Sequence, residues 1–427
     1  MHRGNMLCLT LKIVLLIAAV SLLMTNLWAA SAKKLHNFGI TNTDGVNPYP
    51  LIFDTAGNLY GTTRTGGSHM CNGSGCGTVF ELSPNGSGGW TERVIHNFGA
   101  GADGWQPRTS LIFDADGNLY GTTAWGGRYN HGTVFELSPN GSGGWTEKRL
   151  HDFGYGGDGA LPYAGLIFDA DGNLYGTTAA GGAGLGHCTF DQVPGCGTVF
   201  EMTPNGSGGW TEKKLHSFSF LNENAVVPFA GVIFDSDGNI YGTTRDGGAA
   251  GEGTVYKLSP NGSGGWTEKV IHNFGLIGTD GDAPYASLIF DNAGNLYGTT
   301  VNGGSQNVGV VFEMSPNGSG GWTERVIHNF GISGTDGQVP EGGVIFDSAD
   351  NIYGTTAGGG TYNSGTVFKM TPNGSGGWTE TKLHDFGKGT DGVYPDTGLL
   401  FDSAGNLYGA TFQGGNYNDG TVFEITP

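Results

Sequence analysis

The sequence predicts an all-β fold: a seven-bladed β-propeller of four-stranded blades. One segment, LIFDTAGNLYGTT in its first copy, recurs seven times at spacings of 55 to 66 residues. The repeat is also split between the two ends of the chain, which is expected of a closed ring. The copies begin at Leu51, Leu111, Leu166, Val232, Leu288, Val344 and Leu399.

Each copy contains four short β-rich runs bounded by Gly, Pro and Asn, the pattern of successive hairpins. In the second copy the strands are predicted at 111–113, 119–123, 133–138 and 145–153. The turn between the first two ends in Gly117 and Asn118, residue types that tolerate a positive φ. Gly reaches 83 of 427 residues, which we interpret as turn chemistry because 24 Phe, 16 Tyr and 9 Trp argue against disorder.

The two ends complete one repeat. Residues 34–38 read as a fourth strand without the first three, and residues 421–425 as a third strand without a fourth. We therefore expect residues 33–427 to form one propeller of seven repeats, each about 56 residues long, with the N-terminal strand closing the last blade. An open solenoid would instead need atypical polar caps at both ends.

These motifs resemble the GloVer-type tandem repeat family of secreted "choice-of-anchor" proteins. The resemblance rests on the blocks DG…P…LIFDxxGNLYGTT…GG…GTVFELSP and covers essentially all of residues 33–427. It implies no catalytic residues. Such proteins often carry a C-terminal sorting anchor, and the end of this chain at Pro427 leads us to expect free secretion.

Residues 1–32 read as a signal peptide. A basic start with Arg3 and Lys12 precedes an apolar run of about a dozen residues, too short to span a membrane, and Ala30-Ser31-Ala32 has the small-x-small cleavage pattern. The alternative is an uncleaved anchor. Cleavage predicts a secreted, extracellular protein that starts near Lys33 and contains no membrane span.

The net charge limits the classes of partner that the protein can bind. Removal of residues 1–32 leaves 17 basic and 38 acidic residues, a net charge of −21. Such a field repels phosphate backbones, so we expect no nucleic-acid partner. We expect a monomer with an extracellular ligand, either a glycan or a protein surface.

Four cysteines follow the leader. Cys71 and Cys76 lie in one short loop, and Cys188 and Cys196 in another, which favours two local disulfides. A zinc site is the alternative, but export to an oxidising compartment argues against free thiolates.

Two patterns invite a metal interpretation. Seven histidines occupy the fourth strand, one per blade, so they form a wide ring and cannot converge on one ion. We interpret them as structural, for example as hydrogen-bonding groups between blades. The DxDG turns at Asp114, Asp169 and Asp235 resemble the start of a calcium loop but lack its distal Glu. We therefore predict no metal and no cofactor.

Differences between the copies point to a binding face. The loops between the second and third strands, and between one blade and the next, vary most, and both open on the same face. The residue after the shared Pro should line the pore rim, and its charged variants fall on neighbouring blades with Tyr49 between them. The candidate ligand-binding residues are Tyr49, Arg108, Glu341, Asp396, Arg64, Trp125, Tyr129, Arg245 and Asp246.

Two classes of function remain open. Aromatic, amide and charged side chains on one face suit a non-catalytic module that binds a carbohydrate or a protein surface. The alternative is a lactonase-like propeller hydrolase or lyase with a metal at the pore mouth. That enzyme needs three or four converging ligands, and the sequence offers only Glu341 and Asp396 there.

Overall fold

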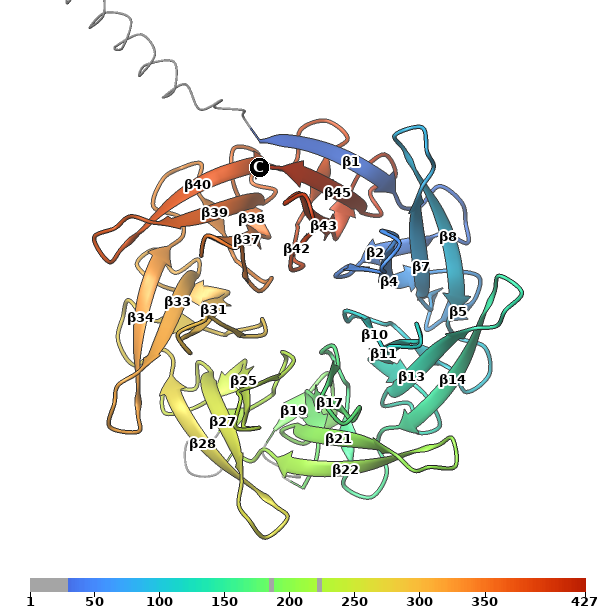
Figure 1. Cartoon of the computed structure of the whole chain (residues 1–427), viewed down its shortest axis with the longest axis horizontal. Helices are drawn as coiled ribbons and strands as arrows, with labels where there is room; N and C mark the ends of the chain where they lie inside the picture. Colours follow the sequence, from blue (N-terminus) through green and yellow to red (C-terminus); the bar gives the residue numbers. More distant parts are fainter. Residues whose placement is uncertain (1–29, 184–187, 221–224) are drawn as a thin grey trace, which may run out of the picture.

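The computed structural model describes residues 30–183, 188–220 and 225–427, which form seven antiparallel sheets around a central pore (Figure 1). The predicted seven-bladed propeller is therefore confirmed. In the second blade the second strand covers the predicted residues, and the others differ from prediction by one residue at one end.

Each blade consists of four strands that follow one another outward from the pore. The innermost strands are β3 (Ile52–Phe53), β10 (Ile112–Phe113), β16 (Ile167–Phe168), β24 (Ile233–Phe234), β30 (Ile289–Phe290), β36 (Ile345–Phe346) and β42 (Leu400–Phe401). The second strands are β4 (Leu59–Gly66), β11 (Leu119–Thr123), β17 (Leu174–Thr178), β25 (Ile240–Thr244), β31 (Leu296–Thr300), β37 (Ile352–Thr356) and β43 (Leu407–Thr411).

The two outer positions are occupied by longer strands. The third strands are β7 (Thr78–Pro84), β13 (Thr133–Pro139), β21 (Thr198–Pro204), β27 (Thr254–Pro260), β33 (Val310–Pro316), β39 (Thr366–Pro372) and β45 (Thr421–Thr426). The outermost strands are β8 (Trp90–Asn97), β14 (Trp145–Asp152), β22 (Trp210–Ser217), β28 (Trp266–Asn273), β34 (Trp322–Asn329), β40 (Trp378–Asp385) and, in the last blade, β1 (Ser31–Asn37).

The turn between the first two strands is organised by one aspartate. Asp114 Oδ1 accepts a hydrogen bond from the Asn118 N–H at 2.8 Å, and its Oδ2 accepts from the Asn118 amide at 2.7 Å and the Tyr120 hydroxyl at 3.0 Å. Asp54 makes the same bonds in a copy where Ala56 replaces the second acid. The turn therefore accounts for the aspartate that recurs in copies with and without the DxDG pattern.

The apolar core lies between blades. One cluster joins Phe98 and Val79 of the first blade to Leu111, Leu119 and Phe135 of the second, and each of these five side chains is fully buried. Because every blade contributes to the clusters on both of its sides, a blade removed from the ring would expose two apolar faces.

Adjacent blades are also joined by a contact between a glycine and a proline. Gly77, with φ +95°, precedes β7, and a Cβ on it would lie 2.5 Å from Cδ of Pro107 in the connection to the next blade, so only glycine fits. The other junctions pair Gly132 with Pro162, Gly197 with Pro228, Gly253 with Pro284, Gly309 with Pro340, Gly365 with Pro395 and Gly420 with Pro48.

The last of these pairs belongs to the split blade, where the ring closes as predicted. β1 pairs antiparallel with β45, and Figure 1 shows the two strands side by side. Lys33 donates to the Gly88 carbonyl of the next blade at 2.9 Å, as Lys148 does to Gly208 and Lys269 to Gly320. The N-terminal strand thus reproduces the contacts of an ordinary outermost strand.

The predicted signal peptide falls almost wholly on residues 1–29, which lie outside the described residues. β1 begins at Ser31, two residues before the predicted mature start at Lys33, and both of these extra residues are exposed. Among the described residues, no helix has the length and hydropathy needed to cross a membrane.

Deletion of residues 33–38 tests the closure. The deletion removes most of the strand that pairs with β45, and with it Phe38, which is fully buried 5.0 Å from the Phe80 ring. Loss of that side chain alone costs about 3–5 kcal/mol. We expect a clearly lower melting temperature in calorimetry, whereas Lys33→Ala with Lys34→Ala, which keeps the backbone pairing, should melt close to the wild type. Equal melting temperatures for the deletion and the wild type would contradict closure by β1.

Candidate functional site

The two variable loops of each blade pair with each other on one face, a feature that the sequence did not predict. In the first blade β2 (Gly45–Pro48) pairs with β4. The other pairs are β9 (Gly104–Trp105) with β12 (Trp125–Gly126), β15 (Gly159–Ala160) with β18 (Ala180–Gly181), β23 (Ala225–Val226) with β26 (Asp246–Gly247), β29 (Gly281–Asp282) with β32 (Asn302–Gly303), β35 (Gly337–Gln338) with β38 (Gly358–Gly359), and β41 (Gly392–Val393) with β44 (Gln413–Gly414).

The residue before each junction proline adopts a left-handed conformation. Gln106 (φ 55°) donates its N–H to the Cys76 carbonyl of the preceding blade at 2.8 Å and accepts from the Ala124 N–H of its own blade at 3.0 Å. Two backbone bonds therefore hold a conformation that L-residues rarely adopt. The equivalent residues, all with φ between 54° and 60°, are Asn47, Leu161, Val227, Ala283, Val339 and Tyr394.

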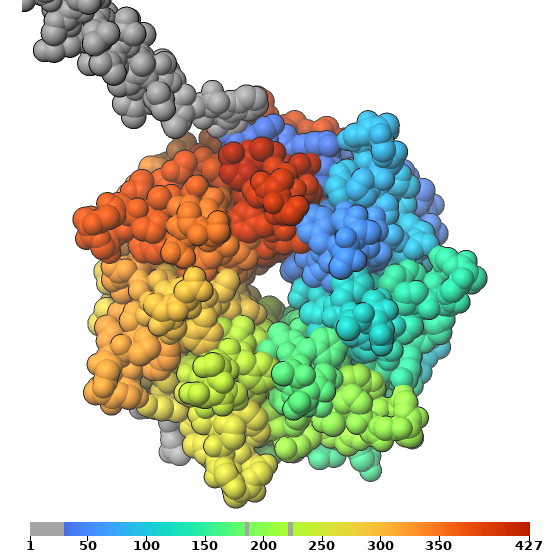
Figure 2. Space-filling view, viewed as in Figure 1, coloured from blue at the N-terminus to red at the C-terminus, as the bar shows by residue number. Residues whose placement is uncertain are grey.

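This fixed backbone directs the residue after each proline into the pore. There the side chains line a cavity of about 450 Å³, and Figure 2 shows the opening at the centre of the ring. The seven post-proline residues in the lining are Tyr49, Arg108, Tyr163, Phe229, Tyr285, Glu341 and Asp396. The structure thus places four of the predicted site residues, Tyr49, Arg108, Glu341 and Asp396, at one cavity.

One arc of the cavity is charged. Burial, and then the Glu341 carboxyl, raise the pKa of Asp396 to about 8. Burial also raises the pKa of Glu341, whereas burial and the nearby Arg108 lower the pKa of Arg64. Oδ1 of Asp396 and the Nε atoms of both arginines are buried without a hydrogen-bond partner. These unsatisfied groups leave the charged arc able to bond a polar ligand.

The opposite arc is aromatic. The Tyr163 ring stacks on Phe229 with 5.0 Å between centroids, and Phe229 lies 4.9 Å from Tyr285. The Tyr163 hydroxyl donates to Asp191 at 2.5 Å, and the Arg108 guanidinium lies 4.9 Å from the Tyr163 ring. A continuous apolar wall therefore faces the carboxyl groups across the pore.

Beside the cavity lies a groove of about 480 Å³, which we call the tryptophan groove; its lining is Asn72, Trp105, Gln106, Arg108, Trp125 and Asn130. The rings of Trp105 and Trp125 stack at 5.8 Å, and the Trp105 indole N–H donates to Asn130 Oδ1 at 3.4 Å. Arg108 lines both spaces, so the groove and the cavity adjoin at its side chain.

Four further predicted residues, Arg64, Tyr129, Arg245 and Asp246, are absent from both linings. The Arg64 guanidinium lies 5.9 Å from the Phe412 ring. Tyr129 stacks on Tyr155 at 5.5 Å instead of facing the cavity. Arg245 forms an ion pair with Asp246, with Nε 2.9 Å from Oδ1, and its guanidinium lies 4.8 Å from the Phe190 ring. Each charge in this pair is thus matched by the other.

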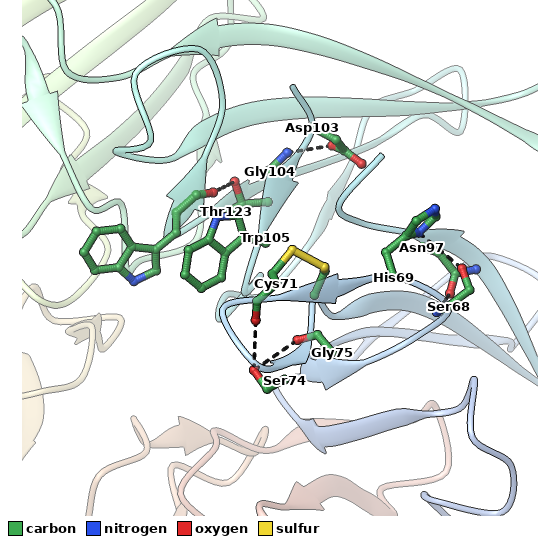
Figure 3. The surroundings of a disulfide bond; sticks show 12 residues. Ser68, His69, Cys71, Ser74, Gly75, Asn97, Asp103, Gly104, Trp105 and Thr123 are labelled. Carbon is green, nitrogen blue, oxygen red and sulfur yellow. Dashed lines mark hydrogen bonds between the residues drawn. A yellow bond between two sulfur atoms is a disulfide. The ribbon is translucent and has the colours of Figure 1, made fainter. Parts of the chain in front are cut away.

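Both predicted disulfides are confirmed, Cys71–Cys76 and Cys188–Cys196, each with 5.0 Å between Cα atoms. The first closes the hairpin of β5 (Met70–Cys71) and β6 (Ser74–Gly75), and the second closes that of β19 (Thr189–Phe190) and β20 (Val193–Pro194). Cys71 and Trp105 pack against the same buried cluster, and Figure 3 shows the bond and the ring together. The first disulfide thus braces the loop that carries Asn72.

The strand histidines occupy a different region, at the junctions between blades. His151 Nε2 lies 2.8 Å from Asp158 Oδ2, and His272 Nε2 lies 3.4 Å from Asp280 Oδ2. A glutamate from the outermost strand of the next blade completes each triplet, Glu212 in the first and Glu324 in the second. The sequence did not predict these triplets, because the glutamate of each comes from a neighbouring blade.

Comparison with known proteins gives one family. The model described as the Gloeobacter/Verrucomicrobia repeat matches residues 26–190 and 185–423. Among solved structures, the chain is similar to a gluconolactonase from Xanthomonas campestris (16% identity, TM-score 0.43, covering 79% of this chain and 90% of the other). It is also similar to a Bacteroides uniformis protein assigned as a 6-phosphogluconolactonase (14% identity, TM-score 0.49, 86% and 89%). No curated protein matches the chain.

The raised pKa of Asp396 predicts a pH-dependent stability. The unfolded chain releases this proton near pH 4 and the folded chain near pH 8. The stabilisation of the fold by the protonated carboxyl is therefore complete below pH 4 and is lost as the pH rises to 8. Asp396→Asn cannot ionise, and we expect its melting temperature relative to wild type to increase between pH 4.5 and pH 8.

Asp402→Asn is the matched control. Although burial raises its pKa, hydrogen bonds from Asn406 hold the pKa of Asp402 below its usual value. Replacement should therefore destabilise the fold most at neutral pH, the opposite sign. Parallel pH profiles for the two variants would contradict the assignment.

Removal of the first disulfide should lower the stability of the fold and weaken ligand binding at the tryptophan groove. The chain-entropy estimate for a loop this short gives about 2 kcal/mol. We expect the double variant Cys71→Ser, Cys76→Ser to lose that amount in denaturant titration. The variant Cys188→Ser, Cys196→Ser, at the other disulfide, is a control for stability alone, because its hairpin carries Asp191, which bonds to Tyr163 of the cavity.

Proposed function

The chain belongs to the Gloeobacter/Verrucomicrobia repeat family, and we propose that this member is an exported, non-catalytic module that binds a carbohydrate on its loop face. The ligand would enter the pore cavity with one sugar ring and extend into the tryptophan groove with the next. Extracellular location is part of the proposal, supported by the leader-like N-terminus and the two disulfides.

The observation that carries the proposal is the division of the cavity into two unlike arcs. Sugars present apolar C–H faces and a perimeter of hydroxyl groups, so a site for them needs flat rings and polar groups together. Tyr163, Phe229 and Tyr285 provide the rings, while Glu341 and Asp396 provide hydroxyl acceptors opposite them. The volume of about 450 Å³ falls within the range of small-molecule sites.

The adjoining groove favours a ligand longer than one ring. Its two indoles offer a second flat surface, and Asn72, Gln106 and Asn130 offer amide groups that can donate and accept. Arg108 stands where the two spaces meet and could bind a carboxylate of the ligand through two hydrogen bonds.

A lactonase-like hydrolase or lyase is the second candidate. It is favoured by the Glu341–Asp396 pair. Burial raises the pKa of Asp396, and the nearby Glu341 carboxyl raises it further. A catalytic zinc ion normally takes three protein ligands, and this pair supplies two of them. Lactone hydrolysis that depends on added metal and is lost in Asp396→Asn would favour this candidate.

A glycan array followed by titration of the best ligand tests the binding proposal. We expect Arg108→Ala and Trp125→Ala each to weaken binding about tenfold, equivalent to about 1.4 kcal/mol, because each removes one contact surface. Asn140→Ala is the control, since this residue organises the hairpin between β13 and β14 at the opposite ends of the strands. Full affinity in both site variants, or an equal loss in the control, would contradict the proposed face.

A further inference from the structure

We propose that the junction between the fourth and fifth blades holds a divalent transition-metal ion of the zinc type, bound by His272, Asp280 and Glu324. His272 lies on β28, Asp280 in the connection that follows it, and Glu324 on β34 of the next blade. One ligand atom from each residue lies within 4.8 Å of the other two. The site is separate from the pore cavity and does not depend on the proposed carbohydrate function.

The spacing of the ligand atoms fits a small ion. His272 Nε2 and Asp280 Oδ2 are 3.4 Å apart, with no hydrogen bond between them. Two ligands bound tetrahedrally to zinc at about 2.0–2.1 Å are separated by about 3.3–3.4 Å. The pair is therefore already set at the separation that a shared zinc ion requires.

Unsatisfied buried atoms point to the same conclusion. His272 Nε2 is buried without a hydrogen-bond partner, unlike His151 Nε2 in the other triplet, and the Asp280 side chain is only 2% exposed. Glu324 Oε1 is also unpartnered, as is Glu212 Oε1 in the other triplet. Two buried carboxyl groups beside one imidazole leave a site that a cation stabilises. Asp280 Oδ1 accepts from the Gly281 N–H at 2.8 Å, which orients Oδ2 towards His272 as an outer contact orients a metal ligand.

The ligand types select the class of ion. Imidazole nitrogen suits zinc and its neighbours, whereas calcium and magnesium prefer sites made of oxygen alone. At the next junction His328, Asp336 and Glu380 line a surface recess of about 330 Å³ together with Lys382, so that junction contains a positive charge. At the proposed site the His272 side chain is 17% exposed, which gives an ion a route of entry from solvent.

Two other junctions carry a positive charge beside the glutamate and serve as comparisons. Lys214 pairs with Phe200 in the strand register and lies near Glu212, and Arg149 holds the same register position and lies near Glu147. Val326 occupies that position beside Glu324. In the Glu212 triplet, His151 also bonds directly to Asp158 at 2.8 Å, which closes the space for an ion.

Equilibrium dialysis of the full chain without a histidine tag against Zn²⁺, with metal analysis, tests the site. We expect one tight equivalent in the wild type, lost in Glu324→Gln and retained in Glu212→Gln and Glu147→Gln. Because the ion joins two blades, Zn²⁺ should also raise the wild-type melting temperature by about 3 °C and leave that of Glu324→Gln unchanged.

Three results would overturn the proposal. They are a wild-type chain that binds no zinc at micromolar concentration, a Glu324→Gln variant that keeps the tight equivalent, and a loss in either control equal to that in Glu324→Gln. Cobalt absorption provides a check that does not rely on a variant, since ligand-field bands should appear on adding Co²⁺ to the wild type and vanish on adding Zn²⁺.

Discussion

The contact between a glycine of one blade and a proline of the next is the constraint on which the rest of this structure depends. At each junction the glycine leaves room for the pyrrolidine ring, and the residue before the proline is held in a left-handed conformation by backbone bonds to both blades, as Gln106 is. For β-branched Val227 and Val339 that conformation is costly, and the two bonds offset the strain. Because the backbone is fixed in this way, the side chain of the residue after the proline points into the pore.

In this site the backbone position of a pore residue does not depend on its side chain. The junction fixes the position, and only the side chain differs among Tyr49, Arg108 and Asp396. Substitution at a single position therefore changes the polarity of the cavity with little effect on the ring. A carboxyl such as Asp396 can be kept there with a raised pKa because the framework, and not that side chain, supplies the stability.

The sequence predicted the fold because its repeat and its split ends are both visible in the order of residues. It also predicted that Tyr49, Arg108, Glu341 and Asp396 share the pore, since each follows the same proline. It did not predict that Trp105 stacks on Trp125, because that contact depends on the pairing of β9 with β12, and two-residue strands have no periodicity. The His272 triplet was missed for a related reason: Glu324 comes from a neighbouring blade.

The split blade has a consequence for assembly. β1 reaches β45 from the other end of the chain, so the same pairing is available between two different copies. An exchange of β1 between copies would keep the pairing of β1 with β45 and require that the connection to the first blade open, with loss of bonds such as that from the Ile40 N–H to Asp44. The balance between ring and exchanged dimer is then set by effective concentration, which favours the ring in dilute solution and exchange on refolding at high concentration.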